Sequence, residues 1–134
     1  MKKNNTARTF EELHIYQRAR KLTNNIYAIT KAGKFSKDFG LTNQIRRAAV
    51  SVMSNIAEGF ERGTNTKFVR FLYIAKASCG EVRAQLQIAQ DQKYISDNQY
   101  RQLYELSQMT SSMLANFITY LQAKNYQDDK EVKL

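Results

Sequence analysis

Residues 68–89, FVRFLYIAKASCGEVRAQLQIA, carry the clearest pattern in this sequence. Seven apolar or small side chains recur there at alternating steps of four and three residues. They are Phe68, Leu72, Ala75, Cys79, Val82, Leu86 and Ala89. Because an α-helix completes a turn about every 3.6 residues, this spacing places all seven on one face. We therefore predict a long amphipathic helix near 66–93.

The same period recurs in three other segments, for which we predict helices near 10–31, 41–61 and 96–124. The apolar face of the first is Ile15, Ala19, Leu22, Ile26 and Ile29. The second has Ile45, Ala48, Val52 and Ile56, and the last has Leu103, Leu106, Thr110, Met113, Phe117 and Leu121. The chain contains no proline and only five glycines, which favours long helices. We predict an all-α fold, an antiparallel up-down four-helix bundle over residues 10–124.

Capping sequences mark the start of two of these helices. Thr9 with Glu12, and Ser96 with Gln99, have the S/T-x-x-E/Q spacing of a capping box. In such a box the first side chain accepts a hydrogen bond from the fourth backbone amide, and the fourth side chain accepts one in return. We expect this pair of bonds at both positions.

The length of 134 residues suits a single domain. No segment approaches the roughly 20 apolar residues that span a bilayer, and no apolar stretch follows the basic N-terminus as in a secretory signal. A single cysteine fits a reducing compartment. We expect a cytoplasmic protein without a membrane role, with a flexible basic tail at 1–9 and a flexible C-terminal tail at 125–134.

Positive charge is concentrated in the first third of the chain. Residues 1–47 hold eleven Lys and Arg residues against three Asp and Glu residues, and residues 48–134 hold ten against nine. An uneven basic charge of this kind favours an anionic partner, with nucleic acid first and an acidic protein second. An ordinary solvated surface is the plainer interpretation. The residues predicted to contact nucleic acid are Arg18, Arg20, Lys21, Lys31, Lys34, Lys37 and Arg46.

Residues with catalytic chemistry are few. His14 is the only histidine, and Cys79 lies in phase with the apolar face of its helix, where a small buried hydrophobe is the simpler interpretation. One histidine and one cysteine do not make a common zinc site. The segment GFERG at residues 59–63 has two glycines but lacks the Lys-Ser/Thr of a phosphate loop. We expect no enzyme, no cofactor and no metal.

Polar residues on the second helix form a sector of their own. Ser51, Asn55 and Glu58 are three or four residues apart, and Arg47 begins the same sector. We predict a structural polar network of these four residues with Arg70, including an ion pair between Glu58 and Arg70 across the turn.

A second apolar stripe on two helices predicts a homo-oligomer. Small residues such as Gly80 would let another helix approach closely, and a tight crossing inside the bundle is the alternative. The predicted interface residues are Val50, Met53, Ala57, Tyr73, Ala77, Gly80 and Ala84.

Four blocks of sequence resemble a known family. They are FEELHIYQRARKLTNNIYAIT, GLTNQIRRAAVSVMSNIAEGFERG, KFVRFLYIAKASCGEVRAQLQIA and YIS. In order and spacing they are similar to the bacterial four-helix-bundle proteins encoded in intervening sequences of 23S ribosomal RNA genes. Two positions depart from that pattern: Val52-Met53-Ser54 replaces a usual proline-containing triplet, and Arg83 occupies a usually acidic position.

This resemblance implies an antiparallel four-helix bundle that assembles as a ring-shaped homopentamer. The resemblance extends more distantly to accessory variability proteins of retroelements, which bind nucleic acid and a reverse transcriptase. With the basic charge, it favours a non-enzymatic homo-oligomer that binds RNA or DNA through backbone contacts, RNA first. The alternative is a protein-interaction scaffold with an acidic partner and no nucleic-acid role.

Overall fold

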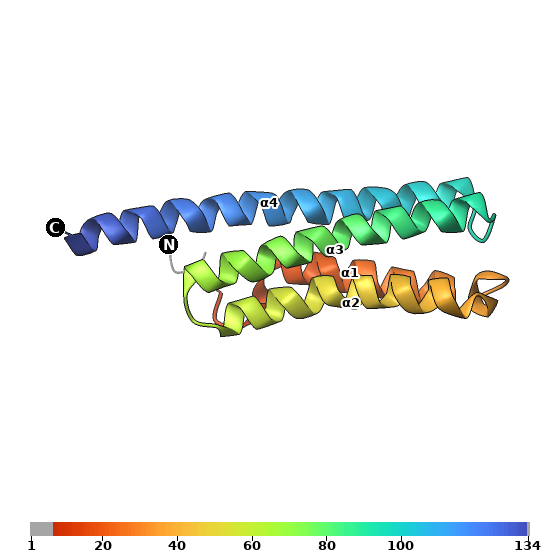
Figure 1. The fold of residues 1–134 in the computed structure, drawn as a ribbon, viewed down its shortest axis with the longest axis horizontal. Helices are drawn as coiled ribbons and strands as arrows, with labels where there is room; N and C mark the ends of the chain where they lie inside the picture. The colour runs from red at the N-terminus through yellow and green to blue at the C-terminus, as the bar shows by residue number, and fades with distance from the viewer. Residues whose placement is uncertain (1–6, 134) are drawn as a thin grey trace.

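A computed structural model describes residues 7–133 of the chain, with side chains for residues 7–124. Its elements in chain order are the 3-10 turn η2 (Phe10–Glu12), α1 (His14–Thr30), the 3-10 turn η3 (Phe35–Lys37), α2 (Phe39–Glu61), α3 (Asn65–Asp91) and α4 (Asp97–Lys133). The four α-helices run antiparallel to their chain neighbours in one bundle (Figure 1). The predicted all-α four-helix bundle is confirmed.

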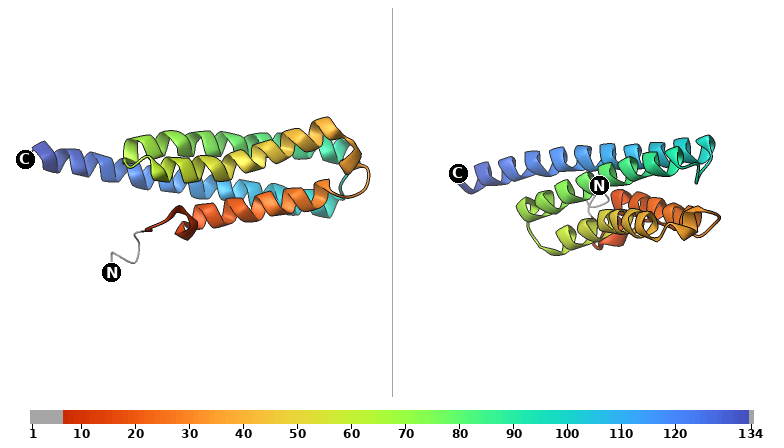
Figure 2. Two further views of the ribbon diagram at one scale, coloured as in Figure 1. Left: turned by 90° about the horizontal axis from the view of Figure 1, so that it is seen from below. Right: turned by 45° about the vertical axis from the view of Figure 1, so that its right-hand side comes forward.

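The helices follow one another around the bundle, and α4 closes it against α1. The C-terminal part of α4 extends past the ends of the other three helices (Figures 1 and 2). The helix end predicted near 124 is therefore wrong, because α4 continues through Lys133. The N-terminal tail predicted at 1–9 falls mostly on residues 1–6, which lie outside the described part, and the flexibility expected of 125–134 stays a prediction.

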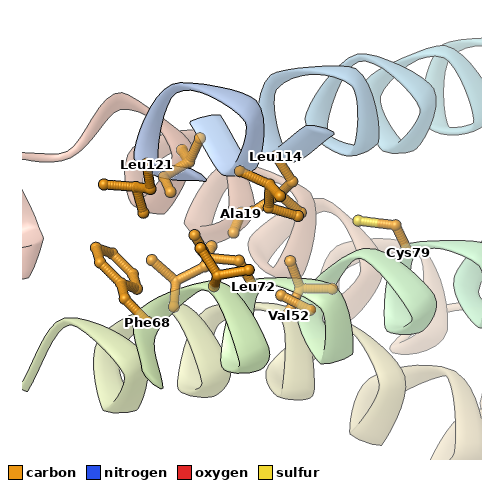
Figure 3. Close-up of a cluster of buried hydrophobic side chains, with 12 residues drawn as sticks. Ala19, Val52, Phe68, Leu72, Cys79, Leu114 and Leu121 are labelled. Carbon is orange, nitrogen blue, oxygen red and sulfur yellow. The ribbon is translucent and has the colours of Figure 1, made fainter. Parts of the chain in front are cut away.

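The core consists of two clusters stacked along the bundle axis. All seven residues of the opening pattern are buried, from Phe68 in one cluster to Ala89 in the other. In the first cluster, Ala19 of α1, Val52 of α2, Leu72 of α3 and Leu114 of α4 converge from the four helices (Figure 3). The 3.6-residue period therefore identified seven of the nine buried residues of α3, and Val69 and Ser78 are buried beside them.

The buried face of α4 differs from the prediction by about one residue. Leu106, Met113 and Phe117 are only half-buried, and the neighbouring positions Ser107, Leu114 and Ile118 are buried in their place. Ser107 satisfies its hydroxyl by donating to the Cys79 carbonyl oxygen at 3.0 Å. A polar residue thus fills a core position because a backbone acceptor on α3 lies within reach.

The two predicted capping boxes have different outcomes. At the start of α4, the Gln99 amide donates to Ser96 Oγ at 3.0 Å, and the Ser96 amide donates to Gln99 Oε1 at 2.9 Å. At the start of the chain, the Thr9 side chain makes no capping bond, and Glu12 accepts from the Arg8 amide instead. The prediction at Thr9 is wrong because Leu13 is extended, so that α1 begins only at His14.

Candidate nucleic-acid-binding surface

Residues 13–57, which comprise α1, the loop after it and α2 as far as Ala57, form a hairpin of nearly uniform charge, which we call the basic hairpin; Glu58 and Glu61 at the C-terminal end of α2 lie outside it. Between residues 13 and 57 the sequence has eight basic residues and a single acidic one, Asp38. The basic residues are Arg18, Arg20, Lys21, Lys31, Lys34, Lys37, Arg46 and Arg47. None of them forms a salt bridge within residues 7–124. The basic hairpin therefore carries positive charge that no carboxylate of its own neutralises.

Asp38 is occupied by two structural bonds. Its Oδ1 accepts from the Leu41 amide at 3.0 Å and caps α2, which explains why that helix begins at Phe39. Its Oδ2 accepts from the Tyr94 hydroxyl at 2.9 Å, and this bond to a carboxylate raises the pKa of Tyr94. The one acid of the basic hairpin thus stabilises the helix start and the contact with the α3–α4 loop.

The predicted nucleic-acid contacts lie on two sides of α1. Arg20, Lys21, Lys31, Lys34 and Lys37 are exposed, and Arg18 and Arg46 are half-buried. These residue types, held on adjacent helices and a loop, can neutralise successive phosphates of a nucleic-acid backbone.

Toward α4, two of these cations line a groove of about 300 Å³. Arg18 and Lys21 form its basic side, His14 and Gln17 continue it along α1, and Met113 of α4 contributes the apolar wall. His14 is exposed, as expected for a surface residue.

Toward α2, the Arg46 side chain lies against α1. Its Nε donates to Thr30 Oγ1 at 2.8 Å, and its guanidinium lies 4.5 Å from the centroid of the Tyr27 ring. Sequence reasoning listed Arg46 but missed Tyr27 and Thr30 as its partners. Their spacing of three residues on α1 is the only sign of such a pair in the sequence.

The predicted polar network is smaller than expected. Asn55 Nδ2 donates to the Ser51 carbonyl oxygen at 2.8 Å, and Ser51 Oγ shares a hydrogen bond of 2.9 Å with Ser78 Oγ on α3. Arg47 is exposed and lies outside this set of bonds, beside a shallow hollow between α2 and α3.

The predicted ion pair between Glu58 and Arg70 is not formed. Glu58 Oε2 instead accepts from Arg62 Nη2 at 2.8 Å, and Arg70 is exposed. Arg62 is four residues from Glu58, so that one helical turn brings the two charges together without crossing to another helix.

The residues predicted for an oligomer interface fall into two patches on different sides. Val50, Met53 and Ala57, the α2 patch, share the flank of α2 on which Arg46 contacts α1. Tyr73, Ala77, Gly80 and Ala84 form the α3 patch. Its tyrosine and both alanines are exposed, and its glycine is half-buried.

Among the described residues, no other helix closely approaches Gly80 of the α3 patch. A Cβ built on Gly80 would meet only Arg83 Nη2, at 3.8 Å. The tight crossing considered for this glycine is therefore not formed within the part of the chain that the structure describes. Sequence reasoning missed the neighbouring Ile74, which is 42% exposed.

The thiol of the single cysteine, Cys79, lies in the core of the bundle. Cys79 is fully buried, and desolvation raises the pKa of its thiol to about 11, although Arg83 and the Ser107 hydroxyl act in the opposite direction. Within residues 7–124, no three His, Cys, Asp or Glu side chains are grouped as metal ligands would be. No described helix is long and apolar enough to cross a membrane.

Comparison with known proteins identifies a family and a similar fold. The sequence model described as that of the 23S rRNA-intervening sequence protein matches residues 11–116. The fold is similar to the crystal structure of a protein with unknown function from the S23 ribosomal protein family of Bacteroides thetaiotaomicron, with a TM-score of 0.72. That pair is 22% identical and covers 78% of this chain and 95% of the other, so the likeness shows the fold alone. A search of curated proteins gave no match.

Proposed function

This chain belongs to the family of 23S rRNA-intervening sequence proteins, and we propose that it is a non-enzymatic homo-oligomer that binds nucleic acid, with RNA as the first candidate. The seven predicted contact residues of the basic hairpin form the binding surface, and their contacts are to the phosphate backbone; Arg47, beside the hollow between α2 and α3, is not one of them. We further propose a cytoplasmic location, which the single cysteine, the free and buried Cys79, supports.

The observation that carries this proposal is the unpaired charge of the basic hairpin. Residues 13–57 contain eight cations and a single carboxylate, that of Asp38, which already caps α2 and accepts a hydrogen bond from the Tyr94 hydroxyl. Exposed cations without internal partners raise the positive potential around a surface and attract polyanions. Salt bridges to neighbouring acids would have cancelled most of this field.

The proposed assembly is a closed ring, and the pentamer implied by resemblance is its expected size. The α2 patch and the α3 patch lie on different sides of the chain, because Arg46 contacts α1 on the flank of the α2 patch. Two different patches support head-to-tail association, in which the α2 patch of one copy meets the α3 patch of the next. Such a ring would also bring several basic hairpins together.

A salt titration tests the nucleic-acid part. We expect the chain to bind a generic single-stranded RNA oligonucleotide at low salt, with log K falling linearly with log salt by about 0.7 per phosphate contacted. The Lys31→Ala/Lys34→Ala variant should lose about 1.4 from that slope, since two contacts are removed. The matched variant Lys67→Ala/Arg101→Ala, which removes two exposed cations outside the basic hairpin, should keep the parent slope.

Absence of RNA binding at low salt would overturn the proposal. Binding of an acidic polypeptide such as polyglutamate under the same conditions, without RNA binding, would favour the scaffold with an acidic partner. A monomer at micromolar concentration in sedimentation velocity would separately overturn the assembly.

A further inference from the structure

We propose that Arg46, held against Tyr27 and Thr30, is a preformed phosphate-binding site that takes one phosphodiester of a bound RNA strand. This inference rests on the proposed function and names the residue that anchors the strand. The other contact residues, exposed except for the half-buried Arg18, then contribute mainly their charge, and Arg46 contributes a guanidinium in a fixed orientation.

Two contacts fix the Arg46 guanidinium before any ligand arrives. Thr30, which is 1% exposed, accepts from Arg46 Nε at 2.8 Å, and its own hydroxyl donates to the Ile26 carbonyl oxygen at 2.8 Å. The Tyr27 ring supports the guanidinium at 4.5 Å, a cation–π distance. The hydrogen bond positions one edge of the group, and the ring restricts its movement on one side.

The opposite edge of the same group is unused. A guanidinium has five N–H donors, and Nε–H is the one that Thr30 takes. The four N–H groups on Nη1 and Nη2 have no acceptor among the described residues, and no carboxylate there pairs with Arg46. Arg46 is therefore a half-buried cation that is held in place without an anion.

The unused edge fits an oxyanion, and the neighbouring cations favour the phosphates of a polyanionic strand. Two parallel N–H groups of a guanidinium match two oxygens of a phosphate or a carboxylate, and a fixed fork loses less side-chain freedom on binding than a mobile lysine does. Further cations lie along the same flank of α1. Lys31 is four residues after Tyr27, and Arg20 is seven before it, so a strand anchored at Arg46 would meet both.

Arg46 and its sequence neighbour Arg47 offer a matched test. Both carry one positive charge on α2, but Arg47 is exposed and makes no cation–π contact or hydrogen bond within residues 7–124. We expect Arg46→Lys to weaken binding of a single-stranded RNA oligonucleotide about tenfold, because it keeps the charge and loses the fork. Arg47→Lys should stay within about twofold of the parent. The salt slope of Arg46→Lys should match the parent, and that of Arg46→Ala should fall by about 0.7.

Two further variants separate binding from a purely structural role. Tyr27→Phe keeps the ring face under Arg46 and should bind like the parent, and Tyr27→Leu removes that face and should weaken binding several-fold. Thermal unfolding of each variant identifies any loss of fold. If Arg46→Lys is folded and binds like the parent, or if Arg47→Lys loses as much, the inference is wrong. A parent chain that binds no RNA at low salt contradicts the proposed function instead.

The source of the phosphate is tested with inorganic pyrophosphate. A site for a phosphodiester within a strand should bind free pyrophosphate at least a hundredfold more weakly than the oligonucleotide, because the strand also contacts the neighbouring cations. Pyrophosphate that displaces the oligonucleotide at micromolar concentration would overturn the assignment to a strand.

Discussion

Gly59 lies where the last turn of α2 passes the first turns of α3. A Cβ placed on it would approach Phe68 Cδ1 and Phe71 Cβ to 2.8 Å, and the Phe68 carbonyl oxygen to 3.3 Å. Backbone and a fixed Cβ do not yield as the end of a flexible side chain does. The glycine is therefore required for the close approach of the two helices, a role that its place in the segment GFERG does not reveal.

We expect Gly59→Ala to lower the free energy of unfolding by about 1–3 kcal/mol, as for overpacking of a core. Gly80→Ala is the matched control, because its Cβ would make only an ordinary van der Waals contact with Arg83 Nη2, at 3.8 Å, and alanine favours helix by about 0.5–1 kcal/mol. Denaturant unfolding of a monomeric form checks both. Equal effects of the two substitutions would contradict the packing at Gly59.

The Cys79 thiol should be inert in the folded chain. Burial raises its pKa from an ordinary 9.0 to about 11, so the folded state disfavours the thiolate. We expect a thiol reagent at pH 8 to label native Cys79 at least about a hundredfold more slowly than the chain unfolded in denaturant. Comparable rates in the two states would mean that the thiol is accessible.

The same shift has a consequence for stability at high pH. Because the folded pKa lies above the ordinary value, the stabilising contribution of the neutral thiol is complete below about pH 9 and is lost as the pH rises through about 11. Cys79→Ala should unfold with a weaker dependence on pH in that window than the parent does.

At the scale of the element, the two capping sequences form a natural comparison. Ser96 closes a complete capping box with Gln99, and the Thr9 side chain caps nothing. Ser96→Ala should therefore cost about 1 kcal/mol of stability, and Thr9→Ala should stay within about 0.5 kcal/mol of the parent. Thermal or denaturant unfolding measures both, and a larger loss at Thr9 would contradict the start of α1 at His14.

Helix period predicts most of these elements because burial of one face repeats at every turn. It fails at Ser107, since a periodicity of apolar residues passes over a serine whose hydroxyl finds the Cys79 carbonyl oxygen on another helix. The capping sequence at Thr9 fails for a local reason, because the extended backbone of Leu13 separates the turn from the helix. The period describes one helix at a time, and burial of Ser107 depends on the helix that lies beside it.

The candidate site, too, is predicted from the sequence only in part. The charge of the basic hairpin is predicted from the positions of charged residues in the sequence, and so is the exposure of Lys31, Lys34 and Lys37. The support of Arg46 by Tyr27 and Thr30 is not, because it depends on the register between α1 and α2. The ion pair expected between Glu58 and Arg70 is not formed, because Arg62, one helical turn from Glu58, forms the salt bridge instead.

At the scale of the whole molecule, head-to-tail assembly makes a distinctive prediction. Val50→Glu spoils the α2 patch, and Ala84→Glu spoils the α3 patch, so each variant alone should be monomeric. Mixed in equal amounts, they should form one-to-one dimers, because the intact α3 patch of Val50→Glu can bind the intact α2 patch of Ala84→Glu. No intact patch then remains to bind a third copy. Sedimentation velocity distinguishes the outcomes, and a mixture that stays monomeric would contradict association between unlike patches.

Among the side chains of residues 7–124, the bundle contains a single salt bridge, between Arg62 and Glu58, and both partners are about half exposed. A surface pair of this kind contributes at most about 1 kcal/mol. Raising the ionic strength therefore removes little stability from the fold, whereas it weakens phosphate contacts steeply. Concentrated sodium chloride during purification should strip nucleic acid from the cell lysate off the protein while leaving it folded, and dilution should then restore an unoccupied surface ready for measurement.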